Sequence, residues 1–333
     1  MKAVRIHSTG GPEVLRIEEV PNPVPGAGKV LVNLQAAAIN HLDIWVRTGN
    51  VPVELPRILG SEGAGTVDKL GPGVVEVEAG ARVVVTPWIY PPRAYHTPNL
   101  LAQLIGVAHD GCYAEYVALP AANVWPLPKG LNFIEAASIF LTFTTAYHLI
   151  VTRAQLQPGE DVLVVGATGG VGTAAVQIAH ALGARVIAAT RDPQKGERLR
   201  GLGADVVVDS SHNFSQEVKR LTNGSGADLV VELVGHTTWG ESTAAVRKGG
   251  RIATCGATSG AEITVNLQDL YRREIAYIGS YGGTPDEIRR VFKLVEEKRV
   301  HPVLDKTYPL SEAREAQERM EKSLHFGKIV LTM

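Results

Sequence analysis

The chain has 333 residues, of which 45% are hydrophobic and 20% are charged, and its formal net charge is −1. This length suits two domains, and the composition is that of a folded globular protein, which excludes a disordered chain. Because there is no block of Lys or Arg, nothing favours nucleic acid or an anionic membrane as a partner. No apolar run reaches the roughly 18 residues that a membrane span needs, and no apolar leader precedes the first strand. We therefore expect a cytoplasmic protein whose two cysteines, Cys112 and Cys255, are ordinary buried residues.

The first part of the chain, up to residue 125, is predicted to form short strands separated by turns. Proline and glycine clusters at 21–26 and 71–73 punctuate this pattern, and such clusters rarely lie inside helices. We expect a small, irregular β-barrel here. The expected strands are 14–17, 30–34, 81–85 and 112–117.

After residue 130 the pattern changes to apolar runs that alternate with helical segments. Continuous apolar strands of this length suit a parallel sheet covered by helices on both faces. Six such strands with crossover helices predict a dinucleotide-binding (Rossmann) fold. The six runs are 162–165, 186–189, 206–208, 229–233, 252–255 and 275–279.

Several of the helices between these strands have clear boundaries. An apolar stripe at i, i+4, i+7 and i+11 begins at Val171 and predicts a helix that Gly183 ends. Asp192 followed by proline predicts the cap of the next helix, which Gly203 ends. A helix over 286–298 and a last strand over 328–332 are also expected.

The strongest motif is a glycine-rich segment between the strand 161–165 and the helix that follows it. Glycine permits the tight turn and lets backbone N–H groups approach a pyrophosphate, whose charge the helix N-terminus stabilises. The spacing Gly-x-x-Gly-x-x-Gly is one residue longer than the usual pattern, but its place between strand and helix makes it specific. The residues expected to bind the cofactor here are Gly166, Gly169, Gly170, Val171 and Gly172.

The end of the second strand of this sheet indicates which dinucleotide is bound. NAD sites usually place Asp or Glu there, but this chain has Thr190 and Arg191. Asp192 is expected to be used as a helix cap. Arg191 and Lys195 can bind a 2′-phosphate, although solvated cations at a helix start are the alternative. The sequence therefore favours NADP(H).

Seven further motifs follow one another in chain order: Met1–Val4, Gly11–Leu15, Asn40–Asp43, Gly60–Gly65, Gly71–Val74, Asp110–Tyr116 and Gly249–Arg251. Together they resemble the medium-chain dehydrogenase/reductase superfamily, over essentially the whole chain. The resemblance implies a GroES-like, β-rich catalytic domain over 1–127 completed by 284–333, with a Rossmann domain inserted at 128–283. The fold class is thus α/β.

The departures from this family concern its metal ligands. Zinc alcohol dehydrogenases place Cys where Asn40 stands, His where Ser61 stands and a second Cys near 141–145. Only Asp43 and Glu62 remain nearby, which is too few donors for a catalytic zinc. The lobe that binds a structural zinc in relatives, at 86–108, contains no cysteine. We therefore expect no metal, as in the zinc-free quinone oxidoreductase branch.

The resemblance also implies cofactor contacts outside the glycine loop. Thr145 and Gly256 would flank the nicotinamide, Lys328 would point at the phosphates, and Lys195 would lie near the 2′-phosphate. A tyrosine that quinone oxidoreductases use beside this phosphate would fall near Ser210, so that contact is missing.

Without zinc, no Lewis acid polarises the substrate oxygen, and the chemistry that remains is hydride transfer to a conjugated acceptor such as a quinone or enone. We expect the Asn40 carboxamide to donate a hydrogen bond to that oxygen, with a turn-stabilising role as the alternative. Aromatic residues are expected either to line a flat pocket or to pack between domains. They are Trp45, Trp88, Tyr90 and Tyr95.

Other functions stay open. One is an enoyl-thioester, acrylate-type or alkenal reductase, although the proton-donating Tyr of many enoyl reductases is absent from 49–51. Others are an alcohol dehydrogenase-like enzyme and a non-catalytic dinucleotide-binding protein. The apolar edge strand 275–279 further predicts a homodimer, because proteins usually protect such edges and relatives pair this one.

Overall fold

The computed structural model describes residues 1–89 and 103–333, which form two compact units. The β-rich unit contains Met1–Leu141 and Pro302–Met333, and the α/β unit contains Thr142–His301. Both boundaries lie later than the predicted 127/128 and 283/284. The reason is packing: the helix α2 (Phe133–Ala137) contacts strands of the β-rich unit, whereas the helix α9 (Pro285–Glu296) is tied to His148 of the α/β unit through Glu287.

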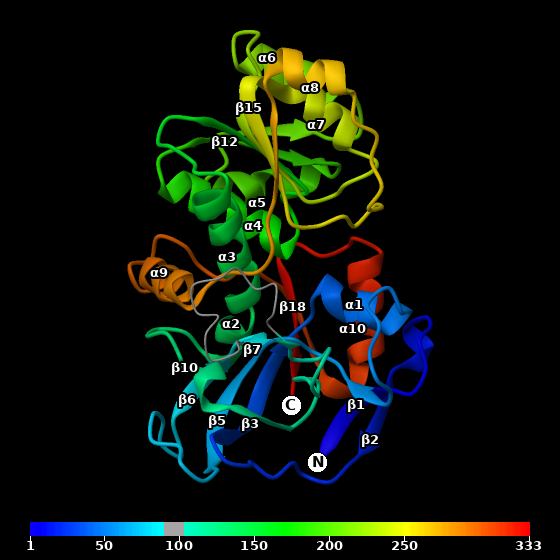
Figure 1. Cartoon of the computed structure of the whole chain (residues 1–333), viewed down its shortest axis with the longest axis vertical. Coiled ribbons are helices and arrows are strands. Elements are labelled where there is room, and N and C mark those ends of the chain that lie inside the picture. Colours follow the sequence, from blue (N-terminus) through cyan, green and yellow to red (C-terminus); the bar gives the residue numbers. More distant parts are fainter. Residues whose placement is uncertain (90–102) are drawn as a thin grey trace. The chain divides into compact units, whose positions relative to one another are not determined.

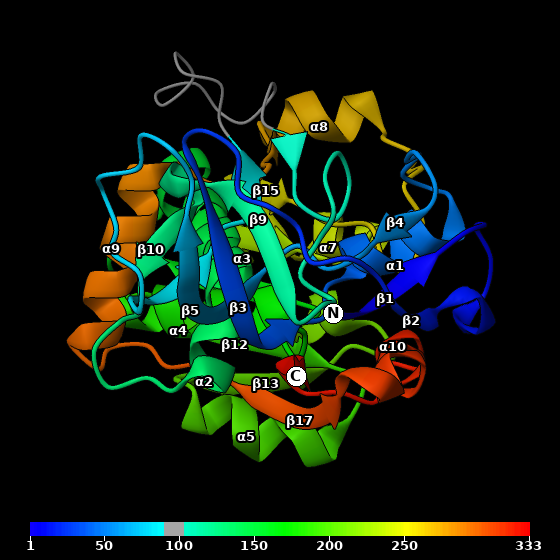
Figure 2. The same cartoon turned by 90° about the horizontal axis from the view of Figure 1, so that it is seen from below.

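The strand β3 (Lys29–Ala38) organises the β-rich unit. It pairs with β5 (Gly63–Leu70), β9 (Tyr116–Pro120) and β18 (Lys328–Thr332), all antiparallel. Figure 1 shows the C-terminal strand β18 in red beside the blue β3, and Figure 2 shows β3 between β5 and β9. Val330 lies opposite Ala38, so the two ends of the sequence build one sheet.

The other elements of the β-rich unit complete its small sheets. The strand predicted at 112–117 begins only at Tyr116, because Cys112 and Tyr113 donate their backbone N–H groups to Gly60 and Leu59 in an irregular segment. Pro12–Val14 form a 3-10 turn, so the strand predicted at 14–17 starts at Arg16. The remaining elements are β1 (Lys2–Ile6), β2 (Arg16–Glu19), β4 (Arg57–Ile58), β6 (Arg82–Val85), β7 (Trp88–Ile89), β8 (Gln103–Leu104), β10 (Val124–Pro126), β17 (Leu304–Pro309), α1 (His41–Thr48) and α10 (Ala313–Glu321).

The α/β unit has one parallel six-stranded sheet in the order β13-β12-β11-β14-β15-β16. Every one of the six predicted apolar runs is a strand of it. Numbered from the first strand, this order is 3-2-1-4-5-6, the doubly wound arrangement that binds a dinucleotide where the order reverses. The strands are β11 (Asp161–Val165), β12 (Arg185–Thr190), β13 (Val206–Asp209), β14 (Ala227–Glu232), β15 (Val246–Thr254) and β16 (Ala276–Gly279).

The helices of this sheet follow the predicted caps. The helix α4 (Gly170–Ala181) carries the apolar stripe, and Gly183, with φ of +83°, follows its end. Helices α4 to α7 pack against the strands that flank them in sequence. The others are α3 (Phe140–Tyr147), α5 (Gly196–Gly201), α6 (Phe214–Leu221), α7 (Trp239–Ala245) and α8 (Leu267–Arg273).

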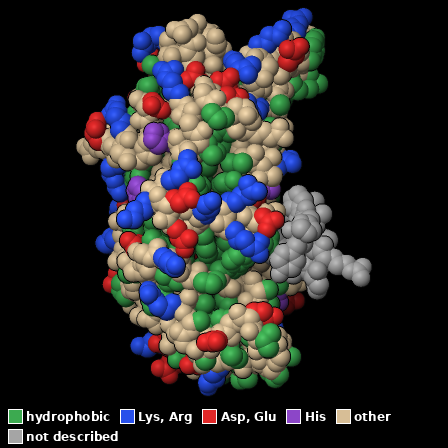
Figure 3. Space-filling view, turned by 90° about the vertical axis from the view of Figure 1, so that its left-hand side faces the viewer, with side chains coloured by type: hydrophobic (Ala, Val, Ile, Leu, Met, Phe, Trp, Pro, Cys, Tyr) green, Lys and Arg blue, Asp and Glu red, His purple; other side chains and the backbone are tan. Residues whose placement is uncertain are grey.

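The described residues contain no helix long and apolar enough to cross a membrane. On the face shown in Figure 3, Lys and Arg side chains lie among Asp and Glu side chains. Several pairs form ion bridges at helix spacing, including Arg289 with Asp286 and Lys293 with Glu297. That face therefore presents no extended field of one sign.

Candidate active site

The glycine loop after β11 has the shape that a pyrophosphate needs. Gly166 has φ of +81°, which side chains rarely adopt. A Cβ on Gly172 would lie 2.2 Å from the Gly166 carbonyl oxygen, so only glycine lets α4 begin this close to the strand. A Cβ on Gly169 would meet only one atom, at 3.7 Å, and so leaves open space beside the helix N-terminus. The predicted strand–turn–helix cradle is confirmed, and its residues fit a dinucleotide phosphate.

The end of β12 carries cations and no free carboxylate. Asp192 caps the turn Pro193–Lys195 by accepting the Gln194 N–H at 3.0 Å, as predicted. Thr190 is buried and its Oγ1 accepts the Asp192 N–H at 3.1 Å. Arg191 is exposed, and Lys195 Nζ lies 3.9 Å from Asp192 Oδ2. The two cations predicted to bind a 2′-phosphate therefore both lie at the end of β12.

The residues predicted to flank the nicotinamide lie in two parts of the α/β unit. Thr145 is 8% exposed and lies inside α3, which begins at Phe140. Gly256 follows β15 in a turn in which Thr254 Oγ1 donates to the Gly256 carbonyl at 3.1 Å. A Cβ on Gly256 would lie 3.4 Å from the Leu233 carbonyl, at the end of the neighbouring strand β14.

A buried charged cluster lies in the β-rich unit where β18 begins, beside the end of its antiparallel partner β3. Lys328 Nζ donates to Glu62 Oε1 at 2.9 Å, to Asn40 Oδ1 at 2.5 Å and to the Ile39 carbonyl at 2.7 Å. Lys328 is 3% exposed and Glu62 is fully buried. An ammonium has three hydrogens, and all three are used here. In this structure Lys328 therefore has no hydrogen left for a cofactor phosphate, which differs from the expectation that it points at the phosphates.

The same cluster orients Asn40. Because an ammonium only donates, its bond to Asn40 assigns the amide oxygen and leaves Nδ2 facing the other side. Nδ2 donates to Glu62 Oε1 at 3.0 Å and to Ser61 Oγ at 3.2 Å. Both amide hydrogens thus bond to acceptors within the protein. To bond to a substrate, Asn40 must give up one of these acceptors. Glu62 uses its second oxygen to accept the Leu141 N–H at 2.8 Å.

Asp43 and His41 place two titrating groups beside this cluster. Asp43 accepts the Asn40 backbone N–H at 2.8 Å and the Tyr113 hydroxyl at 2.9 Å. Burial raises the pKa of Asp43 to about 6 against these bonds and the charge of Lys328, which act in the opposite direction. Burial, and secondly the charge of Lys328, lower the pKa of His41 to about 4. His41 is therefore neutral at pH 7.

The donor set of this cluster does not fit a zinc ion. Among the residues that the structure describes, no three His, Cys, Asp or Glu side chains are grouped as metal ligands would be. Asn40 offers an amide and Ser61 a hydroxyl, and the Glu62 carboxylate is already paired with an ammonium. The nearby Cys112 is buried, which raises its thiol pKa and disfavours the thiolate that binds zinc.

Two of the four aromatic residues predicted to line a flat pocket belong to the described part of the chain. Trp45 is half-buried on α1, with its ring 6.3 Å from that of His41. Trp88 is 3% exposed and packs against Phe140 at 6.5 Å, which is core packing and not an open pocket wall. Tyr90 and Tyr95 lie outside the described residues.

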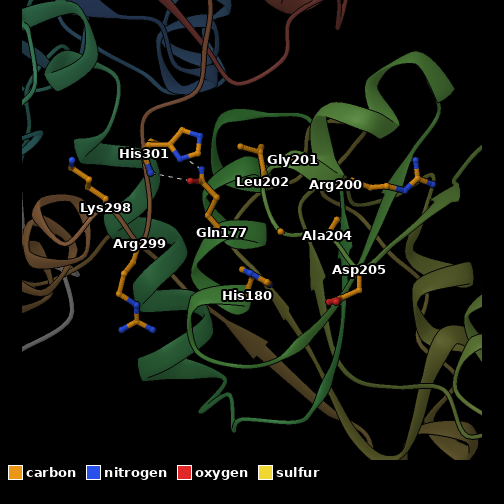
Figure 4. Close-up of a pocket in the computed structure, with 11 residues that line it drawn as sticks. Gln177, His180, Arg200, Gly201, Leu202, Ala204, Asp205, Lys298, Arg299 and His301 are labelled. Atoms are coloured by element: carbon orange, nitrogen blue, oxygen red, sulfur yellow. Dashed lines mark hydrogen bonds between the residues drawn. The ribbon is translucent and has the colours of Figure 1, made fainter.

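A cavity of about 450 Å³ opens at the end of the Rossmann sheet where its strands begin, opposite the end that carries the glycine cradle (Figure 4). Figure 4 shows Lys298, Arg299 and His301, which follow α9, across from Arg200 at the end of α5. Arg299 donates to the Ala181 carbonyl at the end of α4. These cations lie at helix C-termini, where the helix dipole favours them, so capping explains the cluster. The cradle at Gly166 lies at the other edge.

Sequence reasoning missed the pairing of Lys328 with Glu62 and the role of Tyr113. The two charged residues are 266 positions apart, and no local pattern connects them. The available signal was a lone lysine opening an apolar strand, Lys328–Thr332, together with a lone glutamate in Gly60–Gly65. Both residues are buried in the structure, and buried charges are normally paired.

Comparison with known proteins agrees with this geometry. Residues 26–129 match the model of the alcohol dehydrogenase GroES-like domain, and residues 170–297 match that of the zinc-binding dehydrogenase domain. The chain belongs to the medium-chain dehydrogenase/reductase superfamily. This family binds a nicotinamide dinucleotide, so the chain is an oxidoreductase with a GroES-like domain and a Rossmann domain.

Individual relatives carry different activities in their names. A crystal structure of an NAD-dependent alcohol dehydrogenase is 42% identical, with a TM-score of 0.97 and full coverage of both chains. A quinone oxidoreductase of Pseudomonas aeruginosa is 32% identical over 99% of each chain. A mycobacterial protein solved with NADPH is 30% identical, with a TM-score of 0.86 and full coverage of both chains. These names differ in the activity they state, so the substrate has to be inferred from the residues of the site.

The titrations of Asp43 and His41 generate a stability prediction. The folded pKa of Asp43, about 6, exceeds the unfolded value of about 3.9, so Asp43 lowers stability as pH rises from 4 to 6. The folded pKa of His41, about 4, lies below the unfolded value of about 6.5, so His41 raises stability over nearly the same window. In the wild type the two slopes oppose each other.

We expect Asp43→Asn to remove the first slope, because an amide oxygen still accepts both hydrogen bonds without carrying charge. Urea unfolding should then show the variant gaining stability from pH 4 to 6.5, and exceeding the wild type by roughly 2–3 kcal/mol at pH 7. Asp68→Asn, at an exposed position on β5, is the control and should follow the wild type. Parallel pH curves for Asp43→Asn and the wild type would contradict the assignment.

Proposed function

We propose that this protein is an NADPH-dependent reductase that transfers hydride to a quinone or another small conjugated carbonyl without a metal. The observation that carries the proposal is the Lys328–Glu62–Asn40 cluster. It provides an amide, a hydroxyl and a neutralised carboxylate where a metal-dependent alcohol dehydrogenase needs three ligands. Because metal-dependent alcohol dehydrogenases remove the alcohol proton with the help of the metal, and quinone reduction needs no such step, this donor set favours the conjugated acceptor.

The bound dinucleotide supplies the hydride, and the chain supplies binding and orientation. The glycine cradle at 166–172 holds the pyrophosphate. Asn40 exchanges its 3.2 Å hydrogen bond to Ser61 for a hydrogen bond to the substrate oxygen, on which negative charge develops. The ammonium of Lys328 on the amide oxygen polarises Asn40 and fixes the orientation of the amide, so that Nδ2 is the atom available to donate.

The preference for NADPH is supported by Arg191 and Lys195 at the end of β12 and by the use of Asp192 as a cap. The NADPH bound to the mycobacterial relative agrees with it. The name of the 42% identical relative favours an alternative, an NAD-dependent alcohol dehydrogenase. An enoyl-thioester or alkenal reductase is a further alternative, since the same donor set serves either conjugated acceptor.

We also propose that the protein is a homodimer paired through β16. This strand ends the order of the sheet and leaves Ala276 and Gly279 exposed. The helix α8, which precedes β16 in the sequence, has no buried residue. Two of its large apolar side chains are exposed, Leu267 to 68% and Tyr271 to 62%. An unpaired edge strand and large exposed apolar side chains on a helix are each features of a surface for self-association.

Sedimentation at micromolar concentration should therefore give a dimer for the wild type. The double variant Leu267→Asp/Tyr271→Asp should be monomeric, because charge on the apolar surface opposes its burial. Leu324→Asp changes a 54% exposed leucine of the β-rich unit and should stay dimeric. A monomeric wild type would rule the dimer out.

Replacing both Arg191 and Lys195 with Ala should weaken NADPH binding by about 10- to 150-fold and leave NADH binding nearly unchanged. A charge-assisted contact to the 2′-phosphate is worth roughly 1.5–3 kcal/mol. Fluorescence titration with both cofactors measures the two affinities. Lys298→Ala, a cation at the opposite edge of the sheet, should change neither. Equal losses for NADPH and NADH would mean that the two cations stabilise the fold instead.

The substrate proposal predicts NADPH oxidation with small quinones, weaker activity with enones and little with alcohols, insensitive to a chelator. Asn40→Ala should lower kcat by at least about tenfold, since one oxyanion donor is typically worth 10²–10³, with little change in NADPH affinity. Asn123→Ala is the control, because Asn123 is also buried and donates to Thr86 and Trp88. Full turnover by Asn40→Ala would make Asn40 structural, and an alcohol as best substrate would refute the function.

A further inference from the structure

Glu232 is a fully buried carboxylate at the end of β14, next to the point where the sheet order reverses. Within the part of the chain that the structure describes, no Lys, Arg or His contacts it. Its partners are neutral donors: Val234 N–H at 2.7 Å, Gly235 N–H at 3.0 Å, the Thr238 hydroxyl at 3.0 Å and the Ser242 hydroxyl. A buried carboxylate without a counter-ion is costly, so this arrangement calls for a physical reason.

The hydrogen bonds of Glu232 determine the turn that follows β14. Val234 and Gly235 belong to this turn, and Thr238 and Ser242 lie at and within the start of α7. The turn packs on the cofactor cradle: a Cβ on Gly166 would lie 3.1 Å from Val234 Cγ2 and 3.4 Å from Leu233 Cβ. The position of the turn therefore bounds the space beside the first cradle glycine.

The same turn is bonded to the loop that follows β15. Ser259 donates both its N–H, at 2.8 Å, and its hydroxyl, at 2.9 Å, to the Val234 carbonyl. His236 N–H donates to the Gly260 carbonyl at 3.2 Å. Gly256, in that second loop, lies against the Leu233 carbonyl. The two loops thus form one platform, 233–238 with 256–260, at the sheet edge where α/β folds of this kind bind dinucleotides.

We propose that Glu232 is a positioning residue of the cofactor site. Its carboxylate gathers four donors from one turn and one helix start and so holds the platform between Gly166 and Gly256 in the shape that receives the dinucleotide. The inference rests on the dinucleotide half of the proposed function and is independent of the hydride acceptor and of the choice between NADPH and NADH.

The experiment measures dinucleotide affinity and stability together, on the full-length protein. Glu232→Ala should weaken NADPH and NADH by the same factor, about tenfold or more, because an unanchored platform must be ordered when the cofactor binds. Glu232→Gln should retain most of the affinity, since its amide oxygen still accepts the Val234 and Gly235 N–H groups and both hydroxyls can reorient. Hydrogen exchange in Glu232→Ala should accelerate in 233–238 and in 256–260 alike.

The matched control is Glu160→Ala. Glu160 is also largely buried and hydrogen-bonded, to Arg251 at 2.5 Å and 2.9 Å, but it precedes β11 at the opposite edge of the sheet. This variant should lose stability in a thermal melt and keep wild-type affinity. Thr238→Val, which removes one donor and keeps the carboxylate, is the second test if Glu232→Ala does not fold, and it should weaken both cofactors.

Two results would overturn the proposal. One is wild-type affinity for both cofactors in folded Glu232→Ala, or in Thr238→Val if Glu232→Ala does not fold. The other is an equal loss of affinity in Glu160→Ala at matched stability, which would make the effect one of general destabilisation. Failure of the proposed function looks different: the wild type would bind NADPH, the Glu232 variants would behave as above, and no conjugated carbonyl would be reduced.

Discussion

The buried pair of Lys328 and Glu62 is the interaction on which the β-rich unit and its candidate site depend. Lys328 opens β18, the last strand of the chain, while Glu62 precedes β5 and Asn40 precedes α1. One ammonium therefore joins three distant segments at their ends. Removing one partner of such a pair typically costs about 3–5 kcal/mol, because the other charge stays buried and unpaired. We regard the return of the C-terminal strand to β3 as inseparable from this pairing.

The pair also determines the electrostatics of the site. Glu62 is neutralised by an internal cation, which leaves it little capacity to bind a metal, and Lys328 is neutralised by Glu62, which leaves it no hydrogen for a phosphate. Asn40 lies between them and is held in one orientation. Asp43 and His41 lie close enough for the charge of Lys328 to influence both titrations. Polar groups held in one orientation before substrate arrives are what oxyanion stabilisation requires.

The α/β unit satisfies its buried charge in a different way. Its cradle depends on the absence of side chains at Gly166 and Gly172, and its platform depends on Glu232, a charge surrounded by neutral donors. In the β-rich unit a positive and a negative charge satisfy each other. In the α/β unit, only N–H and O–H groups among the described residues donate to the Glu232 carboxylate. Each of these hydrogen bonds fixes the position of the segment that carries the donor.

Local patterns in the sequence were enough to predict the elements and their class. Six apolar runs, the caps at Gly183 and Asp192 and the glycine loop are local patterns, and backbone geometry and hydrophobic periodicity act over a few residues. These predicted the Rossmann sheet and its cradle. The departure from the zinc ligands of the family could also be seen in the sequence, since it concerns the residue type at single positions such as 40 and 61.

The partners of the charged and polar groups, in contrast, depend on the three-dimensional fold. Nothing near Lys328 in the sequence indicates Glu62, and nothing near Asn40 indicates that Ser61 and Glu62 use its amide hydrogens. The unit boundaries likewise followed the packing of α2 and α9 and not the change in local pattern. Burial decides these outcomes, because a charge removed from water must be paired with whatever group the fold brings to it, however distant in the sequence.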